Sequence, residues 1–297
     1  MPDRMIRDAA AYDSYMRHAV GISPAFTDAA SVTQALDIAR AYAPKSLLRG
    51  AVAYGAIAAL QDQTFVGALR DAGNTPEHRA EMVNYILANP AYVSVFKDSD
   101  VAAGLAREAF GPTALRLHAT GKAVRQAAYD IQRQGWSKLP VNDLGGRLAA
   151  AEAAANGDME SDPDAVAQAR QSVSGAAPLP VTAAPLAPPY TPLVAHALQL
   201  AAIAALGEAT DASMDRLAVL TTDDDAAACL GAAKRNFHQC LAVAKPNYED
   251  MFCMGQHALI DTGACMAEAA GVALPPEPPP PPPVIKVATH HKHRAHR

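Results

Sequence analysis

The four cysteines of this chain place the strongest constraint on its fold, because their spacing is symmetric about one point. Cys240 and Cys253 flank that point closely, and Cys229 and Cys265 flank it at a greater distance. Both pairs have their midpoint at about residue 247, within Lys245-Pro246-Asn247. Proline breaks a helix, and asparagine can cap the next one. This arrangement predicts an antiparallel helical hairpin that pairs Cys240 with Cys253 and Cys229 with Cys265.

The rise along the two predicted helices agrees with this nested pairing. The two spacings are eleven and twelve residues, which rise roughly 16.5 Å and 18 Å along a helix. Disulfide geometry can absorb a mismatch of about 1.5 Å. A bond between Cys229 and Cys240 would have to span the full rise of one helix, which exceeds the limit of about 7 Å between bonded Cα atoms.

The rotation of the second helix opposes this pairing. Eleven residues return to nearly the same face of a helix, but twelve rotate by about 120°. Cys253 and Cys265 therefore cannot share a face of an ideal helix. The nested pairing requires a local distortion of the second helix, and we expect it at Gly255 or Gly263.

The cysteines leave two other interpretations open. They can be four buried, reduced thiols of a cytoplasmic protein, or they can bind a metal. Zinc sites use closely spaced cysteine pairs and haem attachment uses C-x-x-C-H, and the sequence contains neither. Met251, Cys253, Met254 and His257 do place soft ligands that suit copper near one another, although methionine on a helix more often fills a core.

The segment from Cys229 to Cys265 resembles the twin-cysteine helical hairpin of coiled-coil-helix-coiled-coil-helix proteins. The spacings here are C-x10-C and C-x11-C, whereas that family usually has C-x9-C, so the likeness lies in the architecture. It covers about forty of the 297 residues. The same stretch also resembles exported alphaproteobacterial proteins of unknown function, a likeness that implies no activity.

Disulfides that persist imply an oxidising compartment, so the cysteine pattern predicts a periplasmic or cell-envelope location. The first residues, MPDRMIRDAAAYDSY, contain charged side chains and no apolar stretch of the kind that a secretory signal has. We give the cysteine spacing more weight, and a cytoplasmic location is the alternative.

The rest of the chain predicts an all-α protein. Alanine makes up roughly a fifth to a quarter of the residues and aromatic residues only 5%, a composition that favours helices over sheets. We expect a helix over 31–43 that Ser31 and Gln34 cap, and a helix from about residue 100 that Gly111-Pro112 kinks or breaks. The longest apolar stretch, 193–206, contains His196 and is too short to span a membrane.

The sequence divides into four parts. We predict a helical bundle over 1–138, a Pro- and Ala-rich connector with short helices over 139–190, and a helical hairpin unit over 191–272. The prolines between residues 178 and 192 favour an extended spacer or a strap over the surface. Residues 273–297 combine a proline run with a basic end, and we expect them to be disordered.

Few residues stand in patterns that suggest catalysis or metal binding. Glu77, His78 and Glu81 lie within about one helical turn, and a solvated first turn with acids near the helix dipole is the simpler interpretation. His257 and Asp261 stand four residues apart and can form an orienting pair, or the histidine can be half-buried for packing alone. Motifs for phosphate loops, nucleophile elbows and zinc proteases are absent, and we predict no cofactor.

The C-terminal tail carries the clearest interaction signal. Its basic side chains, and histidines that gain charge as pH falls through about 6.5, suit a polyanion such as acidic lipid or a cell-wall polymer. Imidazoles can also bind Cu, Ni or Zn, and the tail can equally be inert. The residues are His290, His291, Lys292, His293, Arg294, His296 and Arg297.

These observations lead to one expected function and two alternatives. We expect a non-enzymatic envelope scaffold or adaptor whose tail tethers it to an anionic polymer or membrane surface, with a protein partner also conceivable. The first alternative is a metal-binding protein that uses the His-rich tail, and the second is a helical enzyme acting on cell-wall glycan. The net charge of −5 argues against nucleic-acid binding by the chain as a whole, and we expect no sequence-specific nucleic-acid partner, although nucleic acid is among the polyanions that would suit the tail.

Overall fold

A computed structural model describes residues 1–182 and 184–276 of the chain. In these residues the fold is all-α, as predicted, and the β pairing is limited to an isolated bridge between Pro140 and Pro246. The helices are α1 (Asp3–Val20), α2 (Ala29–Arg40), α3 (Pro44–Ala59), α4 (Gln63–Ala72), α5 (Pro76–Ala88), η1 (Pro90–Val95), α6 (Ser99–Ile131), η2 (Trp136–Lys138), α7 (Leu144–Asn156), α8 (Pro163–Val173), α9 (Pro192–Ala205), η3 (Asp211–Ser213), α10 (Met214–Leu217), η4 (Ala218–Thr221), α11 (Asp224–Val243), α12 (Asn247–Cys253), η5 (Met254–Asp261) and α13 (Thr262–Ala269).

The start and end of α2 differ from the prediction. Asp28 is the N-cap, because its carboxylate accepts a hydrogen bond of 2.8 Å from the backbone N–H of Ser31. Ser31 is the third helical residue and completes the capping box. The helix ends at Arg40, and Pro44 opens α3 at a position where its missing N–H is not needed.

Helix α6 is continuous over 33 residues and passes through Gly111-Pro112. Of the two predicted outcomes, a kink or a break, the break is therefore wrong. Proline inside a helix costs about 3 kcal/mol. Burial of the neighbouring residues offsets this cost, because Phe110 is fully buried and its ring packs over Gly55 of α3. The helix ends at Ile131, and Trp136 lies in the short 3₁₀ helix η2.

The Pro-rich segment before α9 lies along the helices as a strap. Leu179 is 3% exposed, and the backbone N–H of Leu186 donates a 2.9 Å hydrogen bond to the carbonyl of Asp100 in α6. The backbone of Ala184 passes so close to Gly104 that a side chain at that glycine would collide with it. Of the two conformations predicted, the strap over the surface is therefore the one observed.

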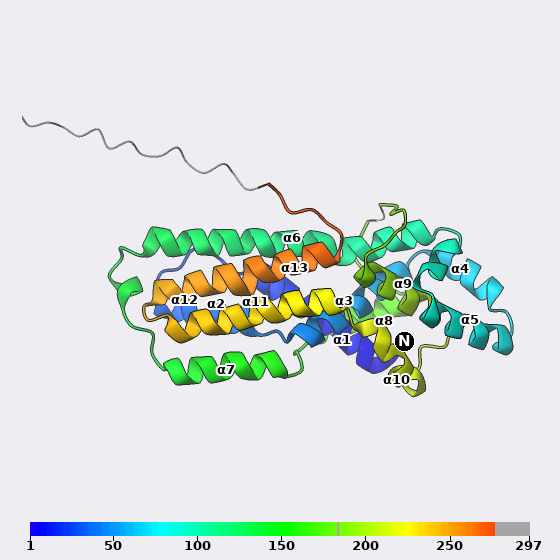
Figure 1. Ribbon diagram of the computed structural model, residues 1–297, viewed down its shortest axis with the longest axis horizontal. Helices are drawn as coiled ribbons and strands as arrows, with labels where there is room; N and C mark the ends of the chain where they lie inside the picture. Colours follow the sequence, from blue (N-terminus) through cyan, green and yellow to red (C-terminus); the bar gives the residue numbers. More distant parts are fainter. Residues whose placement is uncertain (183, 277–297) are drawn as a thin grey trace, which may run out of the picture.

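The four-cysteine segment forms the predicted hairpin. Helix α11 is one arm, and α12, η5 and α13 together form the other (Figure 1). The turn differs from the prediction, because Asn247 does not cap α12. Asn247 is the first helical residue, and its side-chain amide donates a 3.0 Å hydrogen bond to the Leu139 carbonyl.

The hairpin shares its core with the N-terminal helices. Helix α6 packs against α3 along one part of its length and against α12, η5 and α13 along another. One connected cluster of buried apolar side chains runs from Met5 in α1 to Ala270 after α13. Figure 1 shows α6 along one side of the hairpin and α7 on the opposite side, next to α11. Among the described residues, no helix has the length and hydropathy needed to cross a membrane.

Candidate functional site

The disulfides connect the two arms of the hairpin at two heights, as the cysteine spacing predicts. The Cα atoms of Cys229 and Cys265 are 5.7 Å apart, and those of Cys240 and Cys253 are 5.6 Å apart. Cys253 and Cys265 are buried, whereas their partners on α11 are partly exposed. Two such bonds indicate an oxidising, non-cytoplasmic location.

The second arm contains the distortion that the pairing requires. Residues Met254–Asp261 form η5, a π-helix, between the two cysteines of this arm. Its hydrogen bonds run from residue i to i+5, so each residue rotates the helix less than in an α-helix. Over eight residues, this smaller rotation per residue offsets most of the angle of about 120° by which Cys253 and Cys265 would differ in an α-helix. Cys265 therefore faces α11. The distortion begins beside Gly255, one of the two predicted positions.

Three glycines allow the backbone of the second arm to pack directly against the backbone of α6. A Cβ atom placed on Gly255 would lie 2.7 Å from the Arg125 backbone nitrogen, and one on Gly263 would lie 2.6 Å from that of His118. Gly121 on α6 meets η5 in the same way, since its Cβ would lie 2.6 Å from the Ile260 backbone nitrogen. The π-helix is thus held between the disulfides on one side and α6 on the other.

The π-helix presents a polar cluster at the surface. His257 Nδ1 lies 2.7 Å from Asp261 Oδ2, so these residues form the predicted pair. The other oxygen of Asp261 accepts a 2.9 Å hydrogen bond from Gln256, whose side-chain oxygen accepts a 2.5 Å bond from Arg125 on α6. The side chains of His257 and Asp261 are 22% and 28% exposed. A half-buried imidazole oriented by a carboxylate can accept or donate a proton, and π-helical segments are frequent at functional sites.

Lys234 on α11 is a buried charged residue that sequence reasoning missed. It is 5% exposed, and its Nζ donates hydrogen bonds of 2.6 Å and 2.9 Å to the carbonyls of Arg40 and Tyr42. The ammonium also lies 4.2 Å from the centre of the Tyr42 ring. Burial and the nearby Arg40 lower the pKa of Lys234 to about 7. Its contacts satisfy carbonyls at the C-terminal end of α2, which is where a helix favours a cation.

A second missed pair, Arg147 on α7 and Asp250 on α12, is buried where α7 meets the hairpin. The two side chains form an ion pair, and each is less than a tenth exposed. Arg147 also donates a 2.9 Å hydrogen bond to the Leu241 carbonyl of α11. Burial raises the pKa of Asp250 to about 6, and Arg147 partly opposes that shift.

The sequence does carry a signal for these residues. Lys234 occupies the apolar stripe formed by Leu230, Phe237 and Leu241, and Arg147 precedes the buried Ala151 by one turn. A charged residue on the buried stripe of a helix predicts a buried charge that needs partners.

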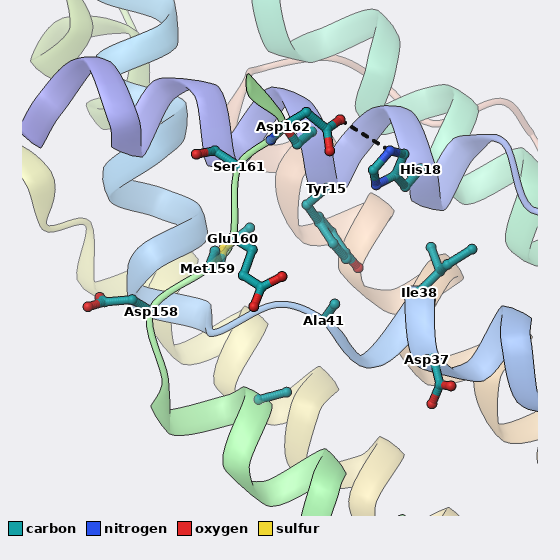
Figure 2. A pocket seen from close by; sticks show the side chains of 12 residues that line it. Tyr15, His18, Asp37, Ile38, Ala41, Asp158, Met159, Glu160, Ser161 and Asp162 are labelled. Carbon is teal, nitrogen blue, oxygen red and sulfur yellow. Dashed lines mark hydrogen bonds and ion pairs between the residues drawn. The ribbon is translucent and has the colours of Figure 1, made fainter. Parts of the chain in front are cut away.

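An acidic pocket of about 490 Å³ lies between α1, the end of α2 and the segment that joins α7 to α8. Figure 2 shows the Glu160 carboxylate and the Tyr15 ring near its centre, with His18 paired to Asp162. His18 Nε2 lies 3.2 Å from Asp162 Oδ2, and the Tyr15 hydroxyl donates a 3.3 Å bond to the Ala39 carbonyl. The buried carboxyl with the raised pKa, Asp250, is not part of this pocket.

The predicted group of Glu77, His78 and Glu81 lies exposed on the first turns of α5. Thr75 caps the helix by accepting a hydrogen bond from the His78 backbone, and the His78 ring lies 3.3 Å from the side-chain oxygen of Asn74. In the described part of the chain, no three His, Cys, Asp or Glu residues come close enough together to hold a metal ion. The structure therefore does not bring these three side chains together as a metal site, and their exposure agrees with a solvated first turn.

The structure does not support the copper interpretation of the hairpin either. Cys253 is bonded to Cys240 and cannot supply a thiolate, and Met251 and Met254 are fully buried in the core. The tail residues, from His290 to Arg297, lie outside the described residues.

Comparisons with protein-family models, with curated proteins and with solved structures found no match for this chain.

Proposed function

We propose that this chain is a structural protein of the cell envelope, a disulfide-stapled scaffold or adaptor whose basic tail tethers it to an anionic polymer or surface. The observation that carries the proposal is the nested pair of disulfides, which joins both ends of the hairpin. Each such bond stabilises a fold by roughly 3 kcal/mol in an oxidising compartment. The hairpin likeness to twin-cysteine proteins supports a structural role for this segment.

The distribution of charge supports the tether. Residues 277–297 contain four Lys and Arg residues and one Glu, whereas the whole chain has a net charge of −5. The acidic body and the basic tail therefore carry opposite charges. A basic segment can bind a polyanion that an acidic body alone would repel.

The enzyme alternative requires a cleft that contains a carboxyl group with a raised pKa. Asp250 has the raised pKa, but it is 2% exposed and paired with Arg147. The carboxylates of the acidic pocket belong to other residues. Because these two features lie on different parts of the molecule, we place the scaffold first.

The first test is the state of the cysteines in the native protein. Alkylation without reductant, followed by mass spectrometry of peptides, should find no alkylated cysteine and the two predicted cross-linked peptides. Free thiols in protein taken from its native compartment would contradict an envelope location.

The second test is binding of the full chain to immobilised polyphosphate and to phosphatidylglycerol vesicles. We expect binding that weakens strongly between low and high salt, because exposed charges are screened, and that deletion of residues 277–297 abolishes. Replacing Lys292, Arg294 and Arg297 by Gln should weaken binding, whereas phosphatidylcholine vesicles should not bind. Retention that is unchanged by the deletion would rule out the tether.

A matched variant separates the metal alternative from the tether. Replacing the four histidines of the tail by Gln keeps its Lys and Arg residues, so polyphosphate binding at about pH 7.5 should persist. Tight uptake of Ni²⁺ or Cu²⁺ that this variant loses, together with weak polyanion binding by the parent chain, would favour the metal-binding function instead. The residues are His290, His291, His293 and His296.

A further inference from the structure

A cluster of aromatic side chains lies at the surface where α5 meets η1. The ring of Tyr92 in η1 is edge-on to two others: its centre is 4.6 Å from that of Tyr85 on α5 and 5.3 Å from that of Phe96, which follows η1. Tyr85 is 53% exposed, and the other two residues are partly exposed. We call Tyr85, Tyr92 and Phe96 the aromatic cluster. Aromatic rings at a surface offer a large apolar contact area to a partner.

The buried side of this region fixes the aromatic cluster to the core. Ile86 and Val93 are fully buried, and Gln199 of α9 donates a hydrogen bond of 2.5 Å to the Ile86 carbonyl. The rings therefore stand on a backbone that packing holds in place. A surface of this kind loses little conformational freedom when a partner binds.

The chemistry of the aromatic cluster favours an uncharged partner that offers carbonyl groups. The sequence contains no charged residue from Met82 to Phe96. Among the described residues, neither the Tyr85 hydroxyl nor the Tyr92 hydroxyl has a hydrogen-bond partner, so both can donate to a ligand. Surfaces lined by aromatic rings bind polyproline segments, whose helix is pre-formed and has free carbonyl groups.

The chain itself contains a segment of this chemistry. Residues 278–283 are six consecutive prolines, which lie outside the described residues. The two distances to the Tyr92 ring place Tyr85 and Phe96 at most about 10 Å apart, which matches the separation of roughly 9 Å between prolines one turn apart in a polyproline helix. The outer rings can therefore contact two prolines on the same face of such a helix.

We propose that the aromatic cluster of one molecule binds residues 278–283 of a second copy. Figure 1 shows the chain after α13 running away from α5, and a proline run is stiff over several residues, so it does not turn back within a short distance. The prolines therefore meet the rings of another molecule. Because each copy carries one aromatic cluster and one proline run, the contact is head-to-tail and joins copies in a series.

Analytical ultracentrifugation of the oxidised full chain measures this association. A contact of this small size predicts a dissociation constant between about 10 µM and 1 mM, so the mean mass should rise with concentration across that range. Replacing prolines 278–283 by Ser should remove the rise. A mass that stays constant up to about 1 mM, or a rise that the Ser variant keeps, would overturn the proposal.

Variants of the aromatic cluster test its role. Tyr85→Ala should weaken the association about tenfold, because it removes the most exposed of the three rings. Tyr92→Phe removes only a hydroxyl donor and should weaken it about twofold to tenfold. Tyr129→Ala on α6 is the matched control, since Tyr129 is 52% exposed, and it should have no effect. Equal effects of Tyr85→Ala and Tyr129→Ala would show that association does not use the aromatic cluster.

A mixture of two variants distinguishes contact between copies from contact within one copy. Tyr85→Ala keeps the prolines and the Ser variant keeps the rings. At a concentration where neither associates alone, the mixture should form pairs and nothing larger.

A synthetic peptide of residues 275–286 completes the test. If it binds the Ser variant but not the parent chain, and the mass of the parent chain stays constant, the prolines occupy the rings of their own molecule and the head-to-tail contact is refuted. Residues 284–297 are unchanged in the Ser variant, so its binding to polyphosphate tests the tether independently.

Discussion

Among the described residues, Lys234 and Arg147 are the buried lysine and arginine, and each joins separate elements of the fold. Lys234 connects α11 to the end of α2, and Arg147 connects α7 to both arms of the hairpin. Both side chains donate hydrogen bonds to backbone carbonyls near the ends of helices, and these bonds explain why the fold tolerates a buried charge in each place.

Lys234 should give the protein a distinct pH dependence. Its pKa of about 7 lies below the ordinary value of 10.5, so between these values the unfolded chain binds a proton that the folded chain has lost. The free energy of unfolding therefore rises with pH across this window. Below the window both states bind the proton, and the destabilisation caused by the buried charge stays constant. From pH 7 to about 9.5, the free energy of unfolding should rise by on the order of 2 kcal/mol more than in Lys234→Met.

Urea unfolding at several pH values measures this difference, and Lys45→Met, an exposed lysine, is the control. The upper limit keeps the measurement below the range where tyrosines of the unfolded chain lose their protons, since burial raises the pKa of Tyr15 and Tyr42 in the folded state. Parallel curves for the parent chain and Lys234→Met would show that burial does not shift this group.

The ion pair between Arg147 and Asp250 should be costly to break from one side. Arg147→Met leaves a buried carboxylate without its partner, so we expect a loss of about 3–5 kcal/mol at neutral pH. Arg147→Met combined with Asp250→Leu removes both charges and should recover most of that loss. Chemical denaturation of the two variants measures the difference, and a double variant as unstable as the single one would contradict it.

At the scale of elements, the segment that forms the π-helix must satisfy two sets of contacts at once. The disulfides require Cys253 and Cys265 to face α11, and the glycines require the opposite side of the arm to lie against α6. An ideal α-helix cannot meet the first requirement when the second cysteine follows the first by twelve positions. The π-helix meets both, with Gly255 at its start.

Gly255→Ala should therefore destabilise the protein, because the added methyl group would overlap backbone atoms of α6. Over-packing of this kind costs about 1–3 kcal/mol. Gly67→Ala in α4 is the matched control, since no atom lies within 4 Å of the added methyl group, and it should stabilise the helix by about 0.5–1 kcal/mol. Thermal unfolding compares the two, and similar effects would argue against close packing at η5.

The sequence predicts the helices and the disulfides better than the ends and the contacts of the elements. Cysteine spacing depends on helical rise, a local and regular quantity, and it identifies the hairpin and the need for a distortion. Helix α6 continues through Pro112, and Asn247 lies inside α12, because of packing partners that are distant in the sequence. No local sequence pattern predicts these two features. The pair of His257 and Asp261 follows from helical spacing, whereas Lys234 finds its partners in a different helix.

At the scale of the whole molecule, α6 unites the parts that composition separates. The change to a Pro-rich sequence after residue 138 suggests two units, yet α6 packs against α3 and also against the hairpin. We predict that the oxidised full chain unfolds in one cooperative transition. Differential scanning calorimetry should give one peak whose calorimetric and van't Hoff enthalpies agree, and two separate peaks would show that the hairpin unfolds independently.

The position of Cys265 also determines how the molecule bears a pulling force. The chain from Cys265 to the tail is short, and Cys265 is covalently joined to Cys229, 36 residues earlier. Tension applied to the tail would cross that bond directly to the start of α11, so the intervening hairpin would carry no load. An oxidised molecule stretched between its ends would fall short of its full length by roughly 120–130 Å, and reduction would release that hidden length.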